Sequence, residues 1–202
     1  GWMKLPFLRG LVGLWDGLIL GTRFLTISAN TQSGENEKLE GLPLYGTLAV
    51  SMLLGVGLFF LLPAGIGHLA ESTLKWNAFL GNLLEGIIRL ILLVGYIWII
   101  GRMPDIRRVF QYHGAEHKTI NAFEAGSELN PEKVAHYSLE HPRCGTSFLL
   151  ALVVISIIVF SLLGPMSAFM RFASRILLLP LLASVAYEYI RLVAYHMENP
   201  FF

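Results

Sequence analysis

Two histidines and a glutamate stand at H-x-x-E-H spacing in the middle of the chain, as His113, Glu116 and His117. On a helix, residues four apart lie on the same face, so both imidazoles can reach one cation. Glu116 lies beside them, where a carboxylate can accept a proton from a metal-bound water. The spacing predicts a divalent metal site, most simply for zinc, with Glu116 as the catalytic general base. The alternative is a polar helix face whose histidines only form hydrogen bonds with their neighbours.

A helical hairpin is expected to support these residues. Pro104 is typical of the first turn of a helix, and Gly126 of the position just past its end. Asn130, with a proline after it, predicts the start of a second helix that runs to about residue 139. At about 1.5 Å per residue, the chain climbs roughly 12 Å from His117 to the end of the first helix and descends as far along the second.

That descent returns the sequence His-Pro-Arg-Cys-Gly, at 141–145, to the level of the H-x-x-E-H motif. The potential metal ligands are therefore His113, His117, His141 and Cys144. Four protein ligands close a structural zinc site, whereas three leave a position for a catalytic water. The residues that can orient a ligand or stabilise charge around this set are Glu124, His136 and Arg143. For Cys144, a small buried residue at the start of a membrane span is the favoured interpretation over ligation.

The composition is that of an integral membrane protein. Of 202 residues, 54% are hydrophobic and 14% charged, and the mean hydropathy is +0.61. Four apolar stretches are long enough for a bilayer crossing, at residues 44–69, 80–100, 146–170 and 176–195. Residues 11–27 are interrupted by Asp16 and Arg23, which favours an interfacial or re-entrant helix. The expected fold is all-α, with about four transmembrane helices, this N-terminal helix and a cytoplasmic helical hairpin.

The chain divides accordingly into four segments. These are the N-terminal interfacial segment and loop (1–43), a first transmembrane pair (44–101), the hairpin (102–145) and a second transmembrane pair (146–202). The hairpin segment is rich in lysine and arginine, so the positive-inside rule places it, and both termini, on the cytoplasmic side of the inner membrane. Arg171 and Arg175, expected at the outer end of the fourth span, argue against this orientation.

Two of the apolar stretches contain charged residues, which must face protein rather than lipid. Glu85 and Arg89 are spaced i,i+4, and Glu188 and Arg191 are spaced i,i+3, so each pair can form within its own helix. The alternative is that the pairs cross between helices and line a polar cavity able to hold a lipid headgroup or a polypeptide.

Two sequence blocks, QYHGAEHKT at 111–119 and HPRCGTSF at 141–148, resemble the YqhQ family. The likeness continues at residues 6–10, 82–89 and 187–191, and so covers nearly the whole chain. The resemblance implies a bacterial and plastid-associated membrane protein of a family whose function is unknown and which is commonly described as a metal-dependent enzyme. It also implies a glycine-rich N-terminal segment and a C-terminal tail that this chain lacks, and we expect the chain to be a trimmed form.

Three classes of function follow. The favoured one is a membrane-embedded metal-dependent hydrolase acting at the cytoplasmic face on a peptide or lipid-linked substrate. The second is a non-enzymatic, oligomeric assembly or translocation factor in which the His/Cys cluster braces the hairpin. The third is a transporter or channel that uses the Glu/Arg pairs, although we find no internal inverted repeat. Membrane lipid and a second copy of the chain are expected partners. The net charge of +1 gives no basis for nucleic acid binding.

Overall fold

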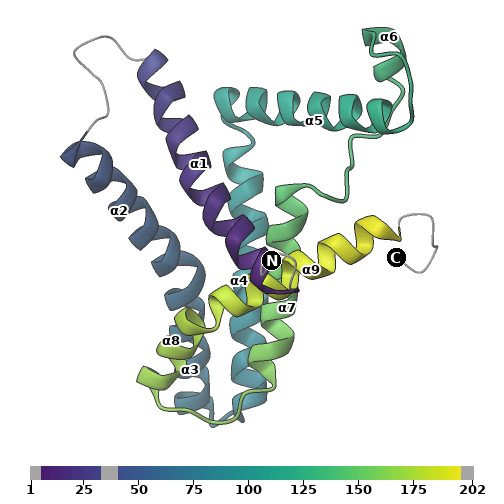
Figure 1. The fold of residues 1–202 in the computed structure, drawn as a ribbon. Helices are drawn as coiled ribbons and strands as arrows, with labels where there is room; N and C mark the ends of the chain where they lie inside the picture. The colour runs from purple at the N-terminus through teal and green to yellow at the C-terminus, as the bar shows by residue number, and fades with distance from the viewer. Residues whose placement is uncertain (1–5, 33–40, 197–202) are drawn as a thin grey trace.

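The structure, a computed structural model, describes residues 6–32 and 41–196, and every regular element in these ranges is helical (Figure 1). The elements are α1 (Leu8–Gln32), α2 (Leu42–Val56), a π-helical turn η3 (Gly57–Leu61), α3 (Leu62–Leu74), α4 (Ala78–Ile100), α5 (Pro104–Glu124), α6 (Pro131–Val134), α7 (Gly145–Ser161), α8 (Ala168–Leu177) and α9 (Leu179–Tyr195). The all-α fold class is confirmed for this part of the chain.

Several helices are long and apolar enough to cross a membrane. Among the described residues, three continuous segments qualify, Leu8–Thr31, Leu42–Leu74 and Ala78–Ile100. A fourth qualifies if α8 and α9, which are bent by 43°, form one broken span. α7 is apolar but only 17 residues long. These lengths and compositions indicate a multi-pass membrane protein.

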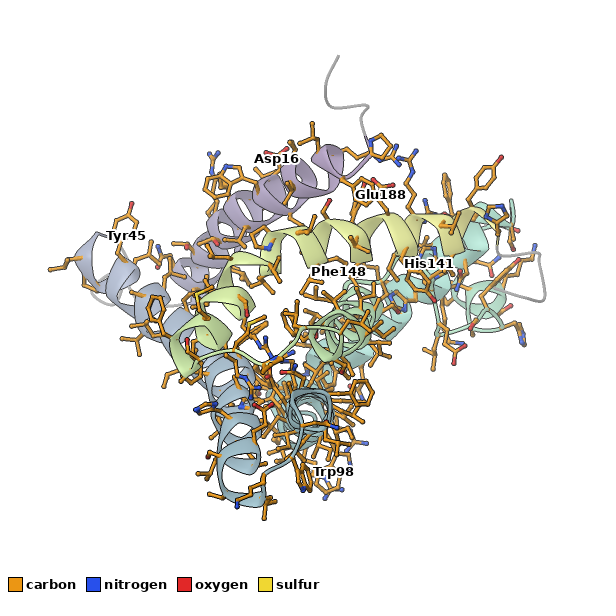
Figure 2. The ribbon with its side chains drawn as sticks, turned by 90° about the horizontal axis from the view of Figure 1, so that it is seen from below. Asp16, Tyr45, Trp98, His141, Phe148 and Glu188 are labelled. Carbon is orange, nitrogen blue, oxygen red and sulfur yellow. The ribbon has the colours of Figure 1, made fainter. Side chains whose placement is uncertain are left out.

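The helices differ in three places from those expected. α1 is one unbroken helix of 25 residues, longer than the stretch 11–27 and long enough to cross a membrane, and Asp16 lies on its outer side (Figure 2). The stretch 146–170 is not one helix, because α7 ends at Ser161 and Pro165 cannot continue a helix. The stretch 176–195 is split, because α8 ends within it and Pro180 lies in the first turn of α9.

A buried ionic network joins α4, α7 and α8. The Glu85 carboxylate lies between two guanidinium groups, with Arg89 Nη2 donating to Oε1 at 2.7 Å and Arg175 Nη2 donating to Oε2 at 2.6 Å. All three side chains are 2% exposed or less. Arg89 Nη1 also donates to Ser156 Oγ at 3.0 Å, and Arg175 Nη2 to Asn82 Oδ1 at 2.6 Å. A network this deep is tolerated because its members satisfy one another's charges and hydrogen bonds.

The π-helical turn η3 adds a further acceptor to this network. Arg89 Nε donates to the backbone oxygen of Phe59 at 2.9 Å, so a carbonyl of the Leu42–Leu74 segment takes part in the buried network. A single π-helical turn inside an α-helix changes the local hydrogen-bond pattern and so allows such a contact.

The intramembrane pairs form in a different pattern from the one expected. Glu85 and Arg89 do pair within α4, as their i,i+4 spacing predicts. Glu188 pairs with Arg9 of α1 instead of with Arg191, and Arg9 Nε donates to its Oε1 at 2.7 Å. Figure 2 shows Glu188 between α1 and α9. This contact fixes the first turn of α1 against α9.

Arg171 and Arg175 are both buried. They lie on α8, where Arg171 pairs with Glu71 of α3 and Arg175 pairs with Glu85. Because the positive-inside rule concerns charges in the loops that flank a membrane, these two internal arginines do not count against the expected orientation.

Replacing Glu85 with glutamine should lower the free energy of unfolding by about 3–5 kcal/mol, because two buried guanidinium groups lose their counter-charge. Titration of the micelle-bound protein with a denaturing detergent measures this change. The control is Glu128→Gln, which breaks an exposed pair with Lys133 and should have little effect. Equal effects of the two variants would contradict a stabilising role for the network.

Gly86 of α4 allows the close approach of α7, since a Cβ built there would lie 2.5 Å from Ile157 Cγ1. Gly86→Ala should therefore destabilise the protein, although alanine favours a helix by roughly 1 kcal/mol over glycine. Gly95→Ala in the same helix meets nothing within 4 Å and should be neutral or stabilising. Thermal unfolding of both variants tests the pair, and a stabilised Gly86→Ala protein would show that the two helices can separate at no cost.

Candidate metal centre

α5 carries the H-x-x-E-H motif and begins and ends as the sequence predicts. Pro104 lies in its first turn. Just past its end, Gly126 has a φ of +67°, in the left-handed region that favours glycine. The N–H of Ser127 donates to the carbonyl of Ala122 at 2.9 Å, which completes a Schellman motif. The chain is thereby turned back along α5.

The second helix of the hairpin is much shorter than expected. Asn130 caps it as predicted, since its Oδ1 accepts the N–H of Lys133 at 2.9 Å. α6 nevertheless covers only Pro131–Val134, and the return segment, residues 135–144, is made of turns and irregular chain. The prediction of a helix to about residue 139 is therefore wrong.

Side chains of α5 explain why the return segment is not helical. Lys118 Nζ donates to two of its carbonyl oxygens at 2.5 and 2.8 Å, and Asn121 Nδ2 donates to two more at 3.0 Å. The four carbonyl groups belong to Ala135, Tyr137, Ser138 and Glu140. These bonds hold the return segment along α5 in place of helical hydrogen bonds, and they carry it to the H-x-x-E-H motif.

Three of the four predicted ligands meet at that point. Ligand atoms of His113, His117 and Cys144 all lie within 4.8 Å of one another, and Cys144 Sγ is 3.4 Å from His113 Nε2. In a tetrahedral zinc site, bond lengths near 2.0–2.3 Å place ligand atoms roughly 3.4–3.8 Å apart. The Cys144–His113 separation already has this value, and the other two, which are at most 4.8 Å, exceed the range by no more than about 1 Å. The cluster can therefore hold a zinc-sized ion through three protein ligands.

A backbone carbonyl orients one of these imidazoles. His117 Nδ1 lies 2.6 Å from the oxygen of Leu139. A carbonyl oxygen only accepts, so in the neutral form of the ring Nδ1 carries the hydrogen and Nε2 keeps the lone pair that a metal needs. The return segment thus fixes the tautomer of His117 as well as bringing Cys144 to it.

His141 lies next to the cluster but is not part of it. Its ring centroid is 5.9 Å from that of His117. Its Nδ1 accepts the N–H of Arg143 at 3.3 Å, so the hydrogen of the neutral ring is on Nε2, which lies 3.5 Å from Glu124 Oε2. Burial and then the charge of His117 lower the pKa of His141, which favours this neutral form. The predicted four-ligand set is thus not assembled, and His141 has the geometry of a supporting residue.

Cys144 is placed at the N-terminus of α7, where its sulfur accepts the N–H of Thr146 at 3.4 Å and lies 2.9 Å from the Thr146 hydroxyl. Burial raises the pKa of the Cys144 thiol. Hydrogen bonds from the Thr146 side chain and from the backbone of Thr146 and Ser147, with the charge of His117, outweigh that effect, so the net pKa is lowered. A thiolate is the form that binds metal.

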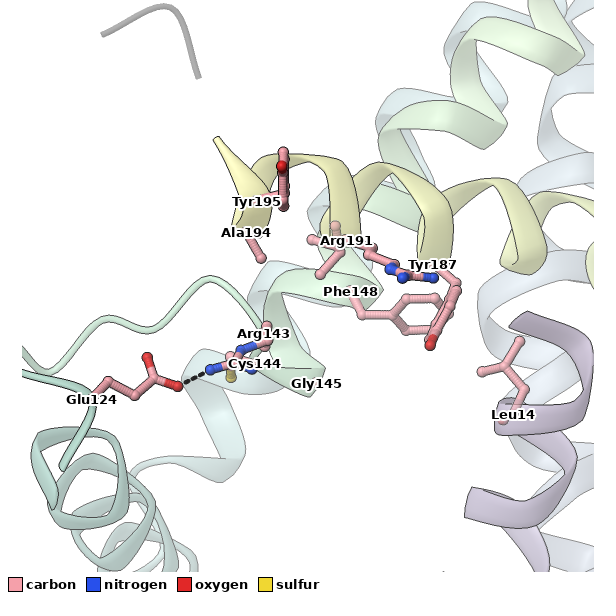
Figure 3. Close-up of a pocket in the computed structure, with 12 residues that line it drawn as sticks. Leu14, Glu124, Arg143, Cys144, Gly145, Phe148, Tyr187, Arg191, Ala194 and Tyr195 are labelled. Atoms are coloured by element: carbon pink, nitrogen blue, oxygen red, sulfur yellow. Dashed lines mark hydrogen bonds and ion pairs between the residues drawn. The ribbon is translucent and has the colours of Figure 1, made fainter. Parts of the chain in front are cut away.

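Of the remaining predicted site residues, Glu116, Glu124 and Arg143 lie at or beside the cluster, and His136 lies away from it. Glu116 is exposed and lines the same open pocket of about 460 Å³ as the three clustered ligands. Glu124 and Arg143 form an ion pair at the edge of this site, as Figure 3 shows. His136 is exposed in the turn after α6, away from these contacts. Glu116, the predicted base, therefore lines the same pocket as the cluster, and His136 has no supporting contact among the interactions described.

The sequence analysis missed two kinds of residue. Lys118 and Asn121 hold the return segment, and Thr146 holds the thiol. A signal for one of them was available, because His113, His117 and Asn121 are spaced at i, i+4 and i+8 and share one helix face. No pattern in the sequence marks the role of Thr146.

The fold and the cluster together define a class: a helical, multi-pass membrane protein with two histidines and a cysteine gathered where a helical segment and its return segment meet. Residues 5–202 match the family described as "Protein of unknown function (DUF1385)". The chain is 34% identical over 203 residues to "Uncharacterized protein YqhQ" of Bacillus subtilis (strain 168), an alignment that covers 94% of this chain and 64% of that protein. The chain belongs to this YqhQ family. No solved structure matches it.

Thr146→Val should raise the pKa of Cys144, because a hydroxyl that stabilises the charged thiolate is lost. The pH dependence of thiol alkylation, measured after metal removal by a chelator, should shift to higher pH. Thr119→Val is the matched control, since the Thr119 hydroxyl bonds only the carbonyl of Ala115 within its own helix. An unshifted alkylation profile in Thr146→Val would mean that the hydroxyl does not stabilise the thiolate.

Proposed function

We propose that this protein is a membrane-embedded, metal-dependent hydrolase. The observation that carries the proposal is the convergence of His113, His117 and Cys144 with a carboxylate, Glu116, in the same pocket. Two nitrogen ligands and one thiolate suit zinc, and three protein ligands leave the fourth position open.

The chain's own residues supply the rest of the chemistry. Zinc, when bound, lowers the pKa of a water ligand toward neutrality. Glu116 is exposed in the pocket, where its carboxylate would accept a proton from a water molecule that attacks a carbonyl or phosphoryl centre. The carbonyl of Leu139 holds His117 in the tautomer that binds metal through Nε2. The Glu124–Arg143 pair at the edge of the pocket provides charge that can orient a substrate.

The proposed location is the cytoplasmic face of the inner membrane. Support comes from the lysines and arginines in the segment that holds the site, which are Arg102, Arg107, Arg108, Lys118, Lys133 and Arg143. α5 lies at one end of α4, across the direction of that helix (Figure 1). A helix in this position follows a membrane surface when α4 crosses the bilayer.

A non-enzymatic, oligomeric assembly or translocation factor is the second candidate. It is favoured by the N-terminal helices, which diverge from the other helices (Figure 1) and bury little of their surface. Only 6% of the apolar window of α1 and 11% of that of the α2–α3 segment are buried. Lipid or further copies of the chain can cover these faces. We do not propose transport, because both carboxylate oxygens of Glu85 are already held by arginines.

Metal analysis of the detergent-purified protein tests the proposed function. We expect about one zinc per chain in the wild type and none after the double change His113→Ala with His117→Ala. His136→Ala is the control and should retain the metal. Glu116→Gln should also retain it, yet hydrolyse a panel of peptide and lipid substrates roughly a hundredfold more slowly or worse. A folded, metal-free wild type purified without chelators would overturn the hydrolase proposal.

A further inference from the structure

A second open pocket, of about 640 Å³, shares a wall with the candidate metal centre (Figure 3). Arg143, Cys144 and Gly145 line both pockets. From this wall the second pocket extends between α1, α7 and α9, where its surface is mainly apolar and includes Leu14, Phe148 and Ile190. Its volume lies within the roughly 300–1,000 Å³ of typical ligand sites.

The charges of this pocket do not cancel. Two arginines, Arg143 and Arg191, and one glutamate, Glu124, give the lining a net charge of +1 when the Cys144 thiol is protonated. Glu124 is already paired with Arg143. Arg191 is exposed and forms no ion pair with any residue of the described ranges, while Glu188, one turn before it on α9, is held by Arg9. The guanidinium of Arg191 therefore makes no ion pair or side-chain hydrogen bond within the described ranges, and the neighbouring carboxylate of Glu188 is already engaged by Arg9.

We propose that this pocket binds an anionic membrane phospholipid through a singly charged phosphodiester headgroup. The phosphate lies between Arg191 and Arg143, where guanidinium groups form charge-assisted hydrogen bonds with its oxygens. The acyl chains follow the apolar surface of Leu14, Phe148 and Ile190. One negative charge balances the pocket, and the apolar wall distinguishes a lipid from a soluble phosphate ester.

The position of the headgroup connects this pocket with the proposed chemistry. A phosphate held by Arg143 lies beside Cys144, one of the three clustered ligands. The lipid is then the substrate class of the hydrolase, and this role rests on the proposed function. Binding of the lipid does not rest on the proposed function, because the pocket and its charge exist without a metal.

The test is a binding titration of the full chain in detergent micelles with phosphatidylglycerol, which is anionic, and phosphatidylcholine, which has no net charge. Wild type should bind phosphatidylglycerol in preference to phosphatidylcholine. Arg191→Gln should weaken binding of phosphatidylglycerol about tenfold and remove the preference, since a charge-assisted contact is lost. The matched control is Arg107→Gln on α5, outside the pocket.

Two glycines of α1 provide a steric test that keeps the charge constant. Gly13 lines the pocket, and a Cβ there would lie 4.0 Å from Tyr187 Cε2, so Gly13→Leu fills the space beside that ring. Gly17 is one turn further along and has nothing within 4 Å. Both substitutions favour a helix. Gly13→Leu should therefore abolish binding of phosphatidylglycerol, and Gly17→Leu should leave it unchanged.

The outcomes separate the two proposals. Equal binding of both lipids by wild type, or undiminished phosphatidylglycerol binding in Arg191→Gln and Gly13→Leu, would overturn the lipid site whatever the metal content. A wild-type protein that binds no lipid, because a second copy or another part of the chain fills the pocket, would overturn the lipid site as well. Selective binding that persists in Glu116→Gln and in metal-free protein would support the lipid site even where the hydrolase proposal fails.

Discussion

The buried carboxylate of Glu85 is the constraint on which the arrangement of the helices depends. A charge in an apolar interior must be compensated, and Glu85 is compensated by Arg89 of its own helix and Arg175 of α8. Arg175 can reach it only if the chain breaks between α7 and α8 and turns back. The bend between α8 and α9 then directs α9 toward α1 and the return segment, so the network at one end of the molecule determines what lines the pocket at the other.

The cluster of His113, His117 and Cys144 depends on a second constraint, which is how the backbone carbonyl groups of the return segment are hydrogen-bonded. The side chains of Lys118 and Asn121 donate hydrogen bonds to these carbonyl groups, which would otherwise be bonded within a helix. The segment therefore stays irregular. An irregular chain can place the carbonyl of Leu139 on His117 and the sulfur of Cys144 beside His113 at once. A regular helix over the same residues would not offer its carbonyls to α5, because they would be used within the helix.

Much of this could be read from the sequence because it depends on local rules. The ends of α5, the Asn130 cap and the pairing of Glu85 with Arg89 all follow from spacing and capping preferences. The remainder depends on contacts between distant segments. Nothing near Arg175 shows that it meets Glu85. Hydropathy alone does not reveal that α7 stops at Ser161, although Gly164 and Pro165 predict a break just beyond it. The exclusion of His141 was also unpredictable, since it depends on where the return segment places its ring relative to His117.

Cys144 is the chain's single cysteine, and this has a redox consequence. A thiol of lowered pKa is the kind most readily oxidised, and within this chain it has no second cysteine with which to form a disulfide. Oxidation of the free site would therefore lead to a sulfenic acid or to a mixed disulfide with a small thiol. A metal bound there, as we propose, would protect the sulfur from both, so metal binding and oxidation would compete for Cys144.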